Sequence, residues 1–113
     1  PNYGVFDEKR YFTAGREYTV INEDSIKWTV NICEDIWIRP GRVLHQVELR
    51  GSQLIINISA SPYHMGKLNE RKQLLEAQAR RYHTYIAYCN MAGGQDELVF
   101  DGGSLIVSPE GRI

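Results

Sequence analysis

The residue best placed to do chemistry is Cys33, which ends a segment of alternating apolar and polar residues beginning at Ile26 and is followed by the acidic pair Glu34-Asp35. The alternation and the β-branched residues predict a strand. Layered α/β proteins often place reactive groups at the carboxyl end of a strand. A thiol needs a base or a nearby cation to lose its proton before it can attack. Cys33 is therefore a candidate nucleophile; the alternative, an inert buried cysteine, does not account for its charged neighbours.

Other residues with chemical potential have weaker support. Three histidines could pair with the cysteine, as in papain-like proteases, but none has supporting local sequence: His45, His64 and His83. We interpret them as surface or capping residues and predict no metal site, because no histidine pair has ligand spacing beside a second ligand. The pairs Gly93-Gly94 and Gly102-Gly103 lack the full dinucleotide fingerprint and are interpreted as turns.

Composition limits the classes of function. The 113 residues are 42% hydrophobic and 24% charged, which is typical of one globular domain or part of one. Thirteen basic and fourteen acidic residues give a net charge of -1, so we expect no nucleic acid and no membrane surface as partner. Cys33 and Cys89 could form a disulfide, but reduced thiols in the cytoplasm are favoured, with Cys89 in the core.

The elements needed to position Cys33 follow from hydrophobic periodicity and turn residues. We expect strands at Glu17–Ile21, Ile26–Cys33, Leu54–Ile58, Thr84–Cys89, Leu98–Phe100 and Leu105–Val107, with Leu54–Ile58 covered on both faces. Helices are predicted at Pro40–Arg50, stopped by Gly51, and at Lys67–His83, whose charges we assign to its solvated face. Loops and turns are expected at Pro1–Gly15, Asn22–Ser25, Ser59–Gly66 and Met91–Glu97. This order predicts a layered α/β or α+β domain.

The segment Ile32-Cys33-Glu34-Asp35-Ile36-Trp37 resembles the nucleophile motif of the carbon–nitrogen hydrolase (nitrilase) superfamily, in the version found in the glutaminase domains of glutamine-dependent NAD synthetases. Three more segments are similar in the same order, at 1–12, 57–63 and 90–102, and the last is the most specific. The resemblance covers essentially the whole chain and implies part of an α-β-β-α sandwich.

The resemblance also implies a mechanism. Cys33 would attack the side-chain amide of glutamine and form a thioester, ammonia would leave, and water would then release glutamate. Glu8 would be a second glutamate that orients a lysine and the substrate, while the amide N–H of Glu34 would help to hold the oxyanion. The residues gathered around glutamine would be Tyr3, Phe6, Glu34, Trp37, Ser61 and Lys67. Ser61 could instead be a turn hydroxyl, and Lys67 could simply begin the helix.

Residues 1–113 would then form an incomplete glutaminase domain. We expect the general-base glutamate, the catalytic lysine and a synthetase domain to lie outside these residues, so that the 113 residues alone do not hydrolyse glutamine. The domain itself would need no cofactor, whereas ATP, Mg and deamido-NAD would serve the synthetase domain. We expect a cytoplasmic homo-oligomer. The alternatives are a non-catalytic assembly module and a stand-alone nitrilase-type amidase, against which Gly93-to-Gly102 argues.

Overall fold

The computed structural model describes residues 11, 13, 19–37, 45–49, 51–61, 67–95 and 98–113. The loop expected at Pro1–Gly15 lies outside these residues apart from Tyr11 and Thr13. Five strands form one sheet in the order β1-β2-β3-β4-β7. They are β1 (Ile21–Glu23), β2 (Ile26–Ile32), β3 (Leu54–Ser59), β4 (Tyr85–Asn90) and β7 (Leu105–Val107).

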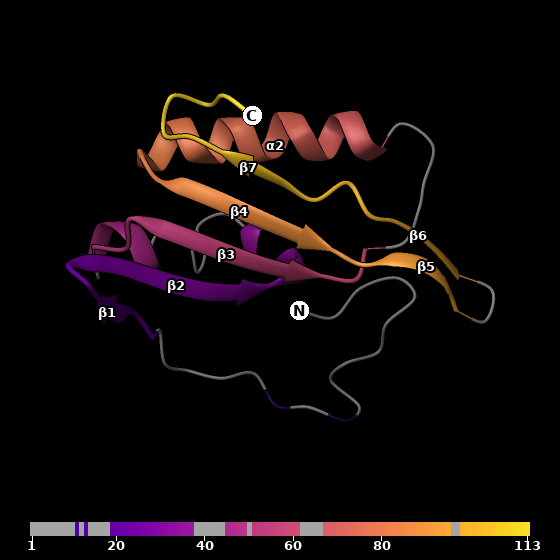
Figure 1. Ribbon diagram of the computed structural model, residues 1–113, viewed down its shortest axis with the longest axis horizontal. Helices are drawn as coiled ribbons and strands as arrows, with labels where there is room; N and C mark the ends of the chain where they lie inside the picture. The colour runs from indigo at the N-terminus through magenta and orange to yellow at the C-terminus, as the bar shows by residue number, and fades with distance from the viewer. Residues whose placement is uncertain are drawn as a thin grey trace.

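The three central strands are parallel, and each edge strand runs antiparallel to its neighbour (Figure 1). The carboxyl ends of β2, β3 and β4 therefore meet at one edge of the sheet. Parallel neighbours need a crossover connection, and α2 (Lys67–Tyr82) provides the crossover between β3 and β4. The mixed α/β architecture expected from the sequence is confirmed.

The β1–β2 connection is shorter than predicted. Asn22 and Glu23 belong to β1, so the turn consists of Asp24 and Ser25, whose φ angles are 49° and 67°. Two successive residues with positive φ are typical of the tight turn that matches the twist of a hairpin. The strand expected at Glu17–Ile21 starts only at Ile21, because Thr19 and Val20 are not in a strand; residues 17 and 18 lie outside the described part of the chain.

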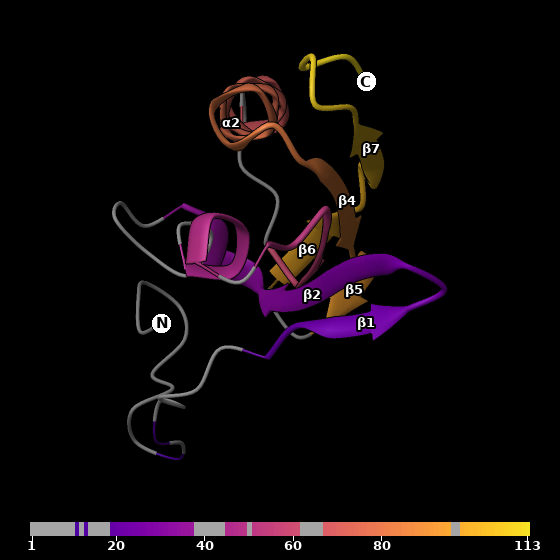
Figure 2. The same ribbon diagram turned by 90° about the vertical axis from the view of Figure 1, so that its left-hand side faces the viewer.

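The helical segments in the described part of the chain lie on one side of the sheet (Figure 2). They are the 3-10 turn η2 (Cys33–Ile36), the wide π-helical turn η3 (His45–Leu49) and α2. The helix predicted at Pro40–Arg50 is described at 45–49 alone, where it is π-helical rather than α-helical. Gly51 ends it as expected: at φ 75° its N–H donates to the Val47 carbonyl at 3.0 Å. None of the described helices has the length and apolar character needed to cross a bilayer.

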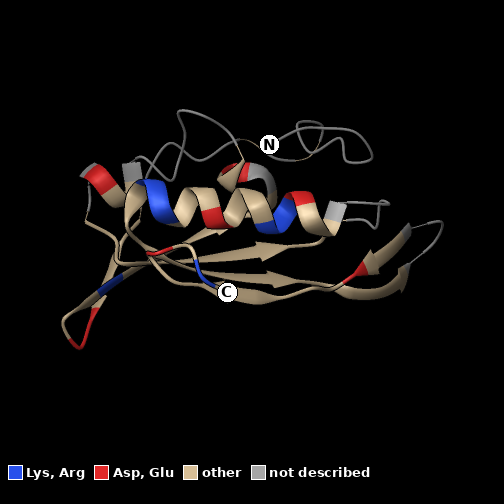
Figure 3. Ribbon diagram, turned by 90° about the horizontal axis from the view of Figure 1, so that it is seen from above, with Lys and Arg blue, Asp and Glu red and all other residues tan. Residues whose placement is uncertain are grey.

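The core lies between the sheet and α2. Its buried side chains are Ile36, Ile55, Leu75, Ala79, Tyr82, Ile86, Tyr88 and Val107. The helical spacing of Leu75, Ala79 and Tyr82 is thereby confirmed as the buried face of α2, while Leu68 is partly exposed. Charged residues are spread along this helix (Figure 3), and Glu70, Arg80 and Arg81 are exposed. Arg71 is the exception, because it is fully buried; assigning every charge of the helix to a solvated face is wrong.

The opposite face of the sheet carries exposed apolar side chains. They include Ile26, Val30, Ile32, Ile58 and Ile106, and Cys89 lies exposed among the β4 residues. The expectations that β3 is covered on both faces and that Cys89 is a core residue are therefore wrong for this structure. Periodicity identified residues that share a face but not the layer that covers it. In the sandwich that the family resemblance implies, a second sheet would cover this face.

Beyond β4 the chain forms a hairpin of β5 (Ala92–Gln95) and β6 (Leu98–Asp101), which extends past the carboxyl ends of the parallel strands (Figure 1). Gly93 and Gly94 thus lie in a strand, not in the predicted loop, because the hairpin provides a partner strand for them. The pair Gly102-Gly103 does not form the expected turn either, because it lies in an irregular segment that continues from β6 to β7; its φ angles are 66° and 71°. A Cβ on Gly103 would lie 2.9 Å from Leu68 Cδ1, which this flexible side chain could relieve by moving, so the positive φ is what favours glycine here.

Candidate active site

Cys33 lies where β2 passes into η2, at the carboxyl edge of the parallel strands. Its φ angle of 49° places it in the left-handed region, which costs a non-glycine residue about 1–2 kcal/mol. Two side-chain hydrogen bonds hold the backbone around it. The Ile32 N–H donates to Asp35 Oδ2 at 3.1 Å, and Asn57 Nδ2 donates to the Cys33 carbonyl at 3.2 Å. The acidic neighbour Asp35 thus closes the turn, and the cysteine itself is half-buried.

The rest of η2 is anchored to the core. Ile36 is fully buried, and its carbonyl accepts a hydrogen bond from Gln78 Nε2 of α2 at 2.8 Å. Trp37 packs against the same core cluster. The turn that carries Cys33 is therefore tied both to β3 and to the helix layer. Such ties are needed to keep a nucleophile in a fixed orientation.

A row of polar side chains crosses the sheet beneath this turn, on the side that faces the helices. Asn31, Asn57 and Tyr88 are aligned by the strand register. Asn57 Nδ2 donates to Asn31 Oδ1 at 2.6 Å, and Asn31 Nδ2 donates to Gln46 Oε1 at 3.3 Å. Gln46 Nε2 in turn donates to Thr29 Oγ1 at 2.8 Å. Hydrogen bonding compensates for burying these groups, so a polar layer persists inside the fold.

Tyr88 ends this row with an unusual hydroxyl. It is buried, and among the described residues its oxygen has no hydrogen-bond partner. Burial raises the pKa of the Tyr88 phenol; the Arg71 guanidinium and the nearby Ser59 hydroxyl act in the opposite direction. The Ser59 hydroxyl donates to Asn57 Oδ1 at 2.6 Å instead. The phenol therefore stays neutral near physiological pH and brings no charge to the site.

Ser61 lies just beyond the carboxyl end of β3, at the same edge of the sheet as Cys33. It is buried, its N–H donates to Asn90 Oδ1 at 2.9 Å, and its Oγ accepts from Arg71 Nη2 at 3.3 Å. Arg71 Nη1 also pairs with Asp101 Oδ2 of β6 at 3.3 Å. Its guanidinium carbon lies 5.6 Å from the centroid of the Tyr88 ring. The serine is thus held by a buried network rather than standing in a free turn.

Arg71 and Asp101 belong to the network around Ser61 but were not predicted from the sequence as part of the site. A signal for the first was present, because position 71 falls four residues before Leu75 on the buried side of α2. Asp101 is the last residue of β6, in a hairpin of which residues 91–97 were predicted to be a loop. Their pairing, 30 residues apart, joins α2 to β6 next to Ser61.

The predicted site residues are described to different extents. Cys33 and Ser61 lie at the same edge of the sheet, and Trp37 follows η2 with its side chain on the core. The positions of Glu8, Tyr3 and Phe6 lie outside the described residues, and for Glu34 and Lys67 the structure describes the backbone alone. Within the described part of the chain no three His, Cys, Asp or Glu residues come together as a metal-binding group.

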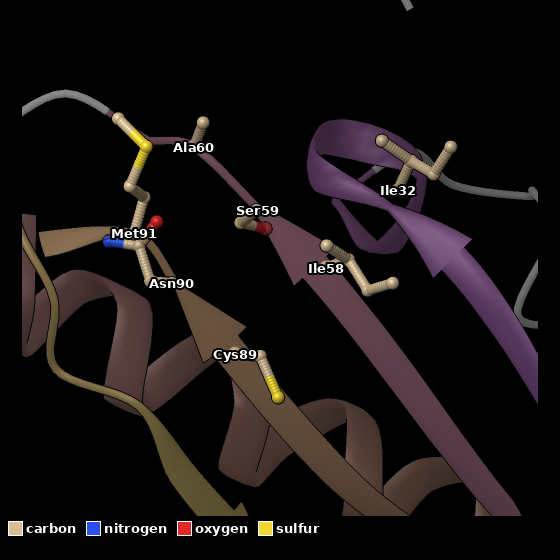
Figure 4. A pocket seen from close by; sticks show the side chains of 7 residues that line it. All are labelled: Ile32, Ile58, Ser59, Ala60, Cys89, Asn90 and Met91. Atoms are coloured by element: carbon tan, nitrogen blue, oxygen red, sulfur yellow. The ribbon is translucent and has the colours of Figure 1, made fainter.

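A hollow of about 500 Å³ lies at the carboxyl ends of the strands, but it does not contain the nucleophile candidate (Figure 4). It is lined by Ile32, Ile58, Ser59, Ala60, Cys89, Asn90 and Met91. Several of these are among the exposed residues of the open sheet face. The hollow therefore belongs mainly to that face, and Cys33 and Ser61 are not among its lining residues.

Comparison with known proteins agrees with this arrangement. The chain is 55% identical over its whole length to a glutamine-dependent NAD(+) synthetase of Thermotoga maritima, of which it covers 20%. It superposes on the glutamine-dependent NAD+ synthetase of Acinetobacter baumannii with a TM-score of 0.90 at 42% identity, covering 98% of this chain and 21% of that one. The chain thus spans about a fifth of the length of these relatives.

A more distant likeness concerns an amidase from Nesterenkonia sp. AN1. The TM-score is 0.84 at 30% identity, with 99% of this chain and 41% of the amidase covered. That structure shows covalent addition of the acetamide moiety of fluoroacetamide at the active-site cysteine. Residues 1–113 match the carbon-nitrogen hydrolase family throughout. The chain, with its cysteine held in a strained turn at the end of a parallel strand, belongs to the carbon–nitrogen hydrolase family.

Proposed function

We propose that these residues form the nucleophile-bearing part of the glutaminase domain of a glutamine-dependent NAD synthetase, which releases ammonia from glutamine to amidate deamido-NAD. The observation that carries this proposal is the 55% identity to the Thermotoga maritima synthetase across the entire chain. The family alone would allow many amide substrates, because fold and chemistry class do not fix the substrate.

Cys33 is the nucleophile in this proposal. Its sulfur bonds to the side-chain carbonyl carbon of glutamine, and the carbonyl π electrons move onto the oxygen. When the tetrahedral intermediate collapses, the carbon–nitrogen bond breaks, and the nitrogen leaves as ammonia with the proton lost by the thiol. Water then adds to the thioester, which releases glutamate and restores the thiol. The half-buried position of Cys33 next to the Glu34 amide supports these roles, since that N–H can donate to the oxyanion.

Ser61 is proposed to contact the glutamine. Its oxygen accepts a hydrogen bond from Arg71, so its own O–H remains a donor that can be directed at the substrate. Lys67, the first residue of α2, is proposed as a further substrate contact. By resemblance to the family, the remaining substrate contacts are Tyr3, Phe6, Glu34 and Trp37, and Glu8 orients the catalytic lysine.

The synthetase reaction would need ATP, Mg and deamido-NAD in a separate domain of the same polypeptide, whereas the glutaminase domain needs no cofactor. A homo-oligomer in the cytoplasm remains part of the proposal. Cys33 and Cys89 are not joined by a disulfide, which is compatible with a reducing compartment.

Replacing Cys33 by Ala in the intact protein tests the proposal. Glutamine-dependent NAD formation should fall to background, while NAD formation from ammonium chloride should continue at the wild-type rate. Cys89→Ala is the matched control and should keep both activities, because Cys89 lies on the face of the sheet that points away from the helices. Loss of both activities in Cys33→Ala would refute the division of labour.

The alternative of a stand-alone amidase is supported by the likeness to the Nesterenkonia enzyme, at lower identity than the likeness to the synthetase. It predicts hydrolysis of short amides with no NAD formation from either nitrogen source. A non-catalytic module predicts that a glutamine-like electrophile labels Cys33 no faster than Cys89. Mass spectrometry of the labelled protein tests the non-catalytic module, while the assays of amide hydrolysis and NAD formation test the amidase.

A further inference from the structure

Asn57 occupies the centre of the polar row, directly beneath the turn that carries Cys33. Its side chain is fully buried. Nδ2 donates to Asn31 Oδ1 at 2.6 Å and to the Cys33 carbonyl at 3.2 Å, and Oδ1 accepts from Ser59 Oγ at 2.6 Å. Both amide hydrogens and the amide oxygen are therefore engaged. Burying an amide without such partners costs free energy, whereas an apolar side chain would need none at this position.

The three bonds fix which way the amide faces. The Cys33 carbonyl can only accept, so it must meet the nitrogen of Asn57; the Ser59 hydroxyl then donates to the amide oxygen and holds the amide in that direction. A reversed amide would place its oxygen against the Cys33 carbonyl oxygen, which cannot donate. Asn57 is thus a rigid donor aimed at one backbone carbonyl.

That carbonyl belongs to the peptide group that joins Cys33 to Glu34. A peptide group is planar, and in the trans form its N–H points away from its carbonyl oxygen. Holding the Cys33 oxygen therefore also sets the direction of the Glu34 N–H. Because Cys33 has a φ of 49°, a conformation that a non-glycine residue rarely adopts, the peptide plane needs such an external restraint.

We propose that Asn57 is a positioning residue that orients the Cys33–Glu34 peptide so that its N–H meets the oxyanion formed from glutamine. This inference rests on the function proposed above. Removing an oxyanion donor outright lowers kcat about 100- to 1000-fold in well-studied hydrolases. Releasing the donor from its restraint should have a smaller effect, on the order of tenfold.

Asn31 offers a matched control. It is also a buried asparagine in the adjacent strand, and it shares a hydrogen bond with Asn57 but has none with Cys33 in the described structure. In the intact protein, Asn57→Ala should lower kcat for glutamine about tenfold or more with KM changed less than about twofold. Asn31→Ala should lower kcat less than about threefold. Ammonia-dependent NAD formation measures the folded, active fraction of each variant.

Alkylation by iodoacetamide gives an independent readout, because this substitution forms the sulfur–carbon bond and expels iodide without forming an oxyanion. The folded Asn57→Ala variant should be alkylated at Cys33 within about twofold of the wild-type rate while its kcat falls about tenfold. Equal kcat losses in the two asparagine variants would overturn the proposal, and so would a parallel fall in alkylation and kcat. A wild-type protein without glutamine-dependent activity would instead refute the proposed function.

Ser59→Ala decides the matter if Asn57→Ala does not fold. It leaves Asn57 in place but removes the hydrogen bond that fixes the direction of its amide. We expect kcat for glutamine to fall about threefold to fivefold with ammonia-dependent synthesis unchanged. A Ser59→Ala variant with the wild-type kcat would overturn the proposal.

Discussion

Neutralising Asp101 should destabilise the protein more than neutralising Arg71. The two side chains pair at 3.3 Å, but Arg71 is 0% exposed whereas Asp101 is 16% exposed. Asp101→Asn keeps the side-chain shape and leaves a guanidinium buried without its counter-charge. Arg71→Met keeps much of the volume and leaves a carboxylate that can still reach water. The difference in burial thus predicts the order of the two effects.

The magnitudes follow from the cost of breaking a buried pair, about 3–5 kcal/mol when one partner is removed. Because the pair is long and Asp101 is partly hydrated, we expect about 3 kcal/mol for Asp101→Asn. For Arg71→Met we expect about 1–2 kcal/mol, which includes the lost hydrogen bond to Ser61 and the lost contact with the Tyr88 ring. The double variant leaves no buried charge, so it should be close to Arg71→Met alone.

Urea titration with pulse proteolysis of the intact protein measures these free energies of unfolding. Because the double variant is expected to cost no more than Arg71→Met alone, a double-mutant cycle should give a coupling close to the cost of Asp101→Asn, about 3 kcal/mol. The reasoning would be refuted if Arg71→Met cost as much as Asp101→Asn, or if the two effects were additive. In either case the buried charge of Arg71 would not be the main cause of the change in the free energy of unfolding.

Three further predictions concern neighbouring residues. Tyr88→Phe should change stability at pH 7 by less than about 1 kcal/mol, because it removes a buried hydroxyl with no partner among the described residues. Since the folded-state pKa of Tyr88 is raised, the wild type should lose stability as pH rises above about 10, and Tyr88→Phe should lose less. Denaturation at pH 7 and pH 10.5 measures both losses, and equal losses in the two proteins would contradict the reasoning. Ile58→Asp should lower the free energy of unfolding of the intact protein by about 2 kcal/mol or more, because the second sheet of the sandwich would bury this residue, which is 54% exposed here. Unchanged thermal stability would mean that this face of the sheet stays open to water. Ser61→Ala should raise KM for glutamine about tenfold with little change in ammonia-dependent synthesis, and steady-state kinetics that show an unchanged KM would exclude Ser61 from substrate binding.

Much of the secondary structure could be predicted from the sequence. Alternating β-branched residues identified β2, and the spacing of Leu75, Ala79 and Tyr82 identified the buried face of α2. Local motifs also pointed to Cys33 and to Gly51 as a helix stop. These features depend on residues close in the chain, which is why one sequence is enough to predict them.

The tertiary structure decided what covers each face and which polar groups meet. In β2 the polar residues Thr29 and Asn31 face the helices, while Val30 and Ile32 face outward. Arg71 is buried because a carboxylate from β6 comes to it, and a pattern within α2 cannot show that. The hydrogen bond from Asn57 of β3 to the Cys33 carbonyl of η2 likewise joins residues 24 positions apart in the chain. Periodicity shows which residues share a face, whereas burial and pairing depend on contacts that form only when distant segments pack together.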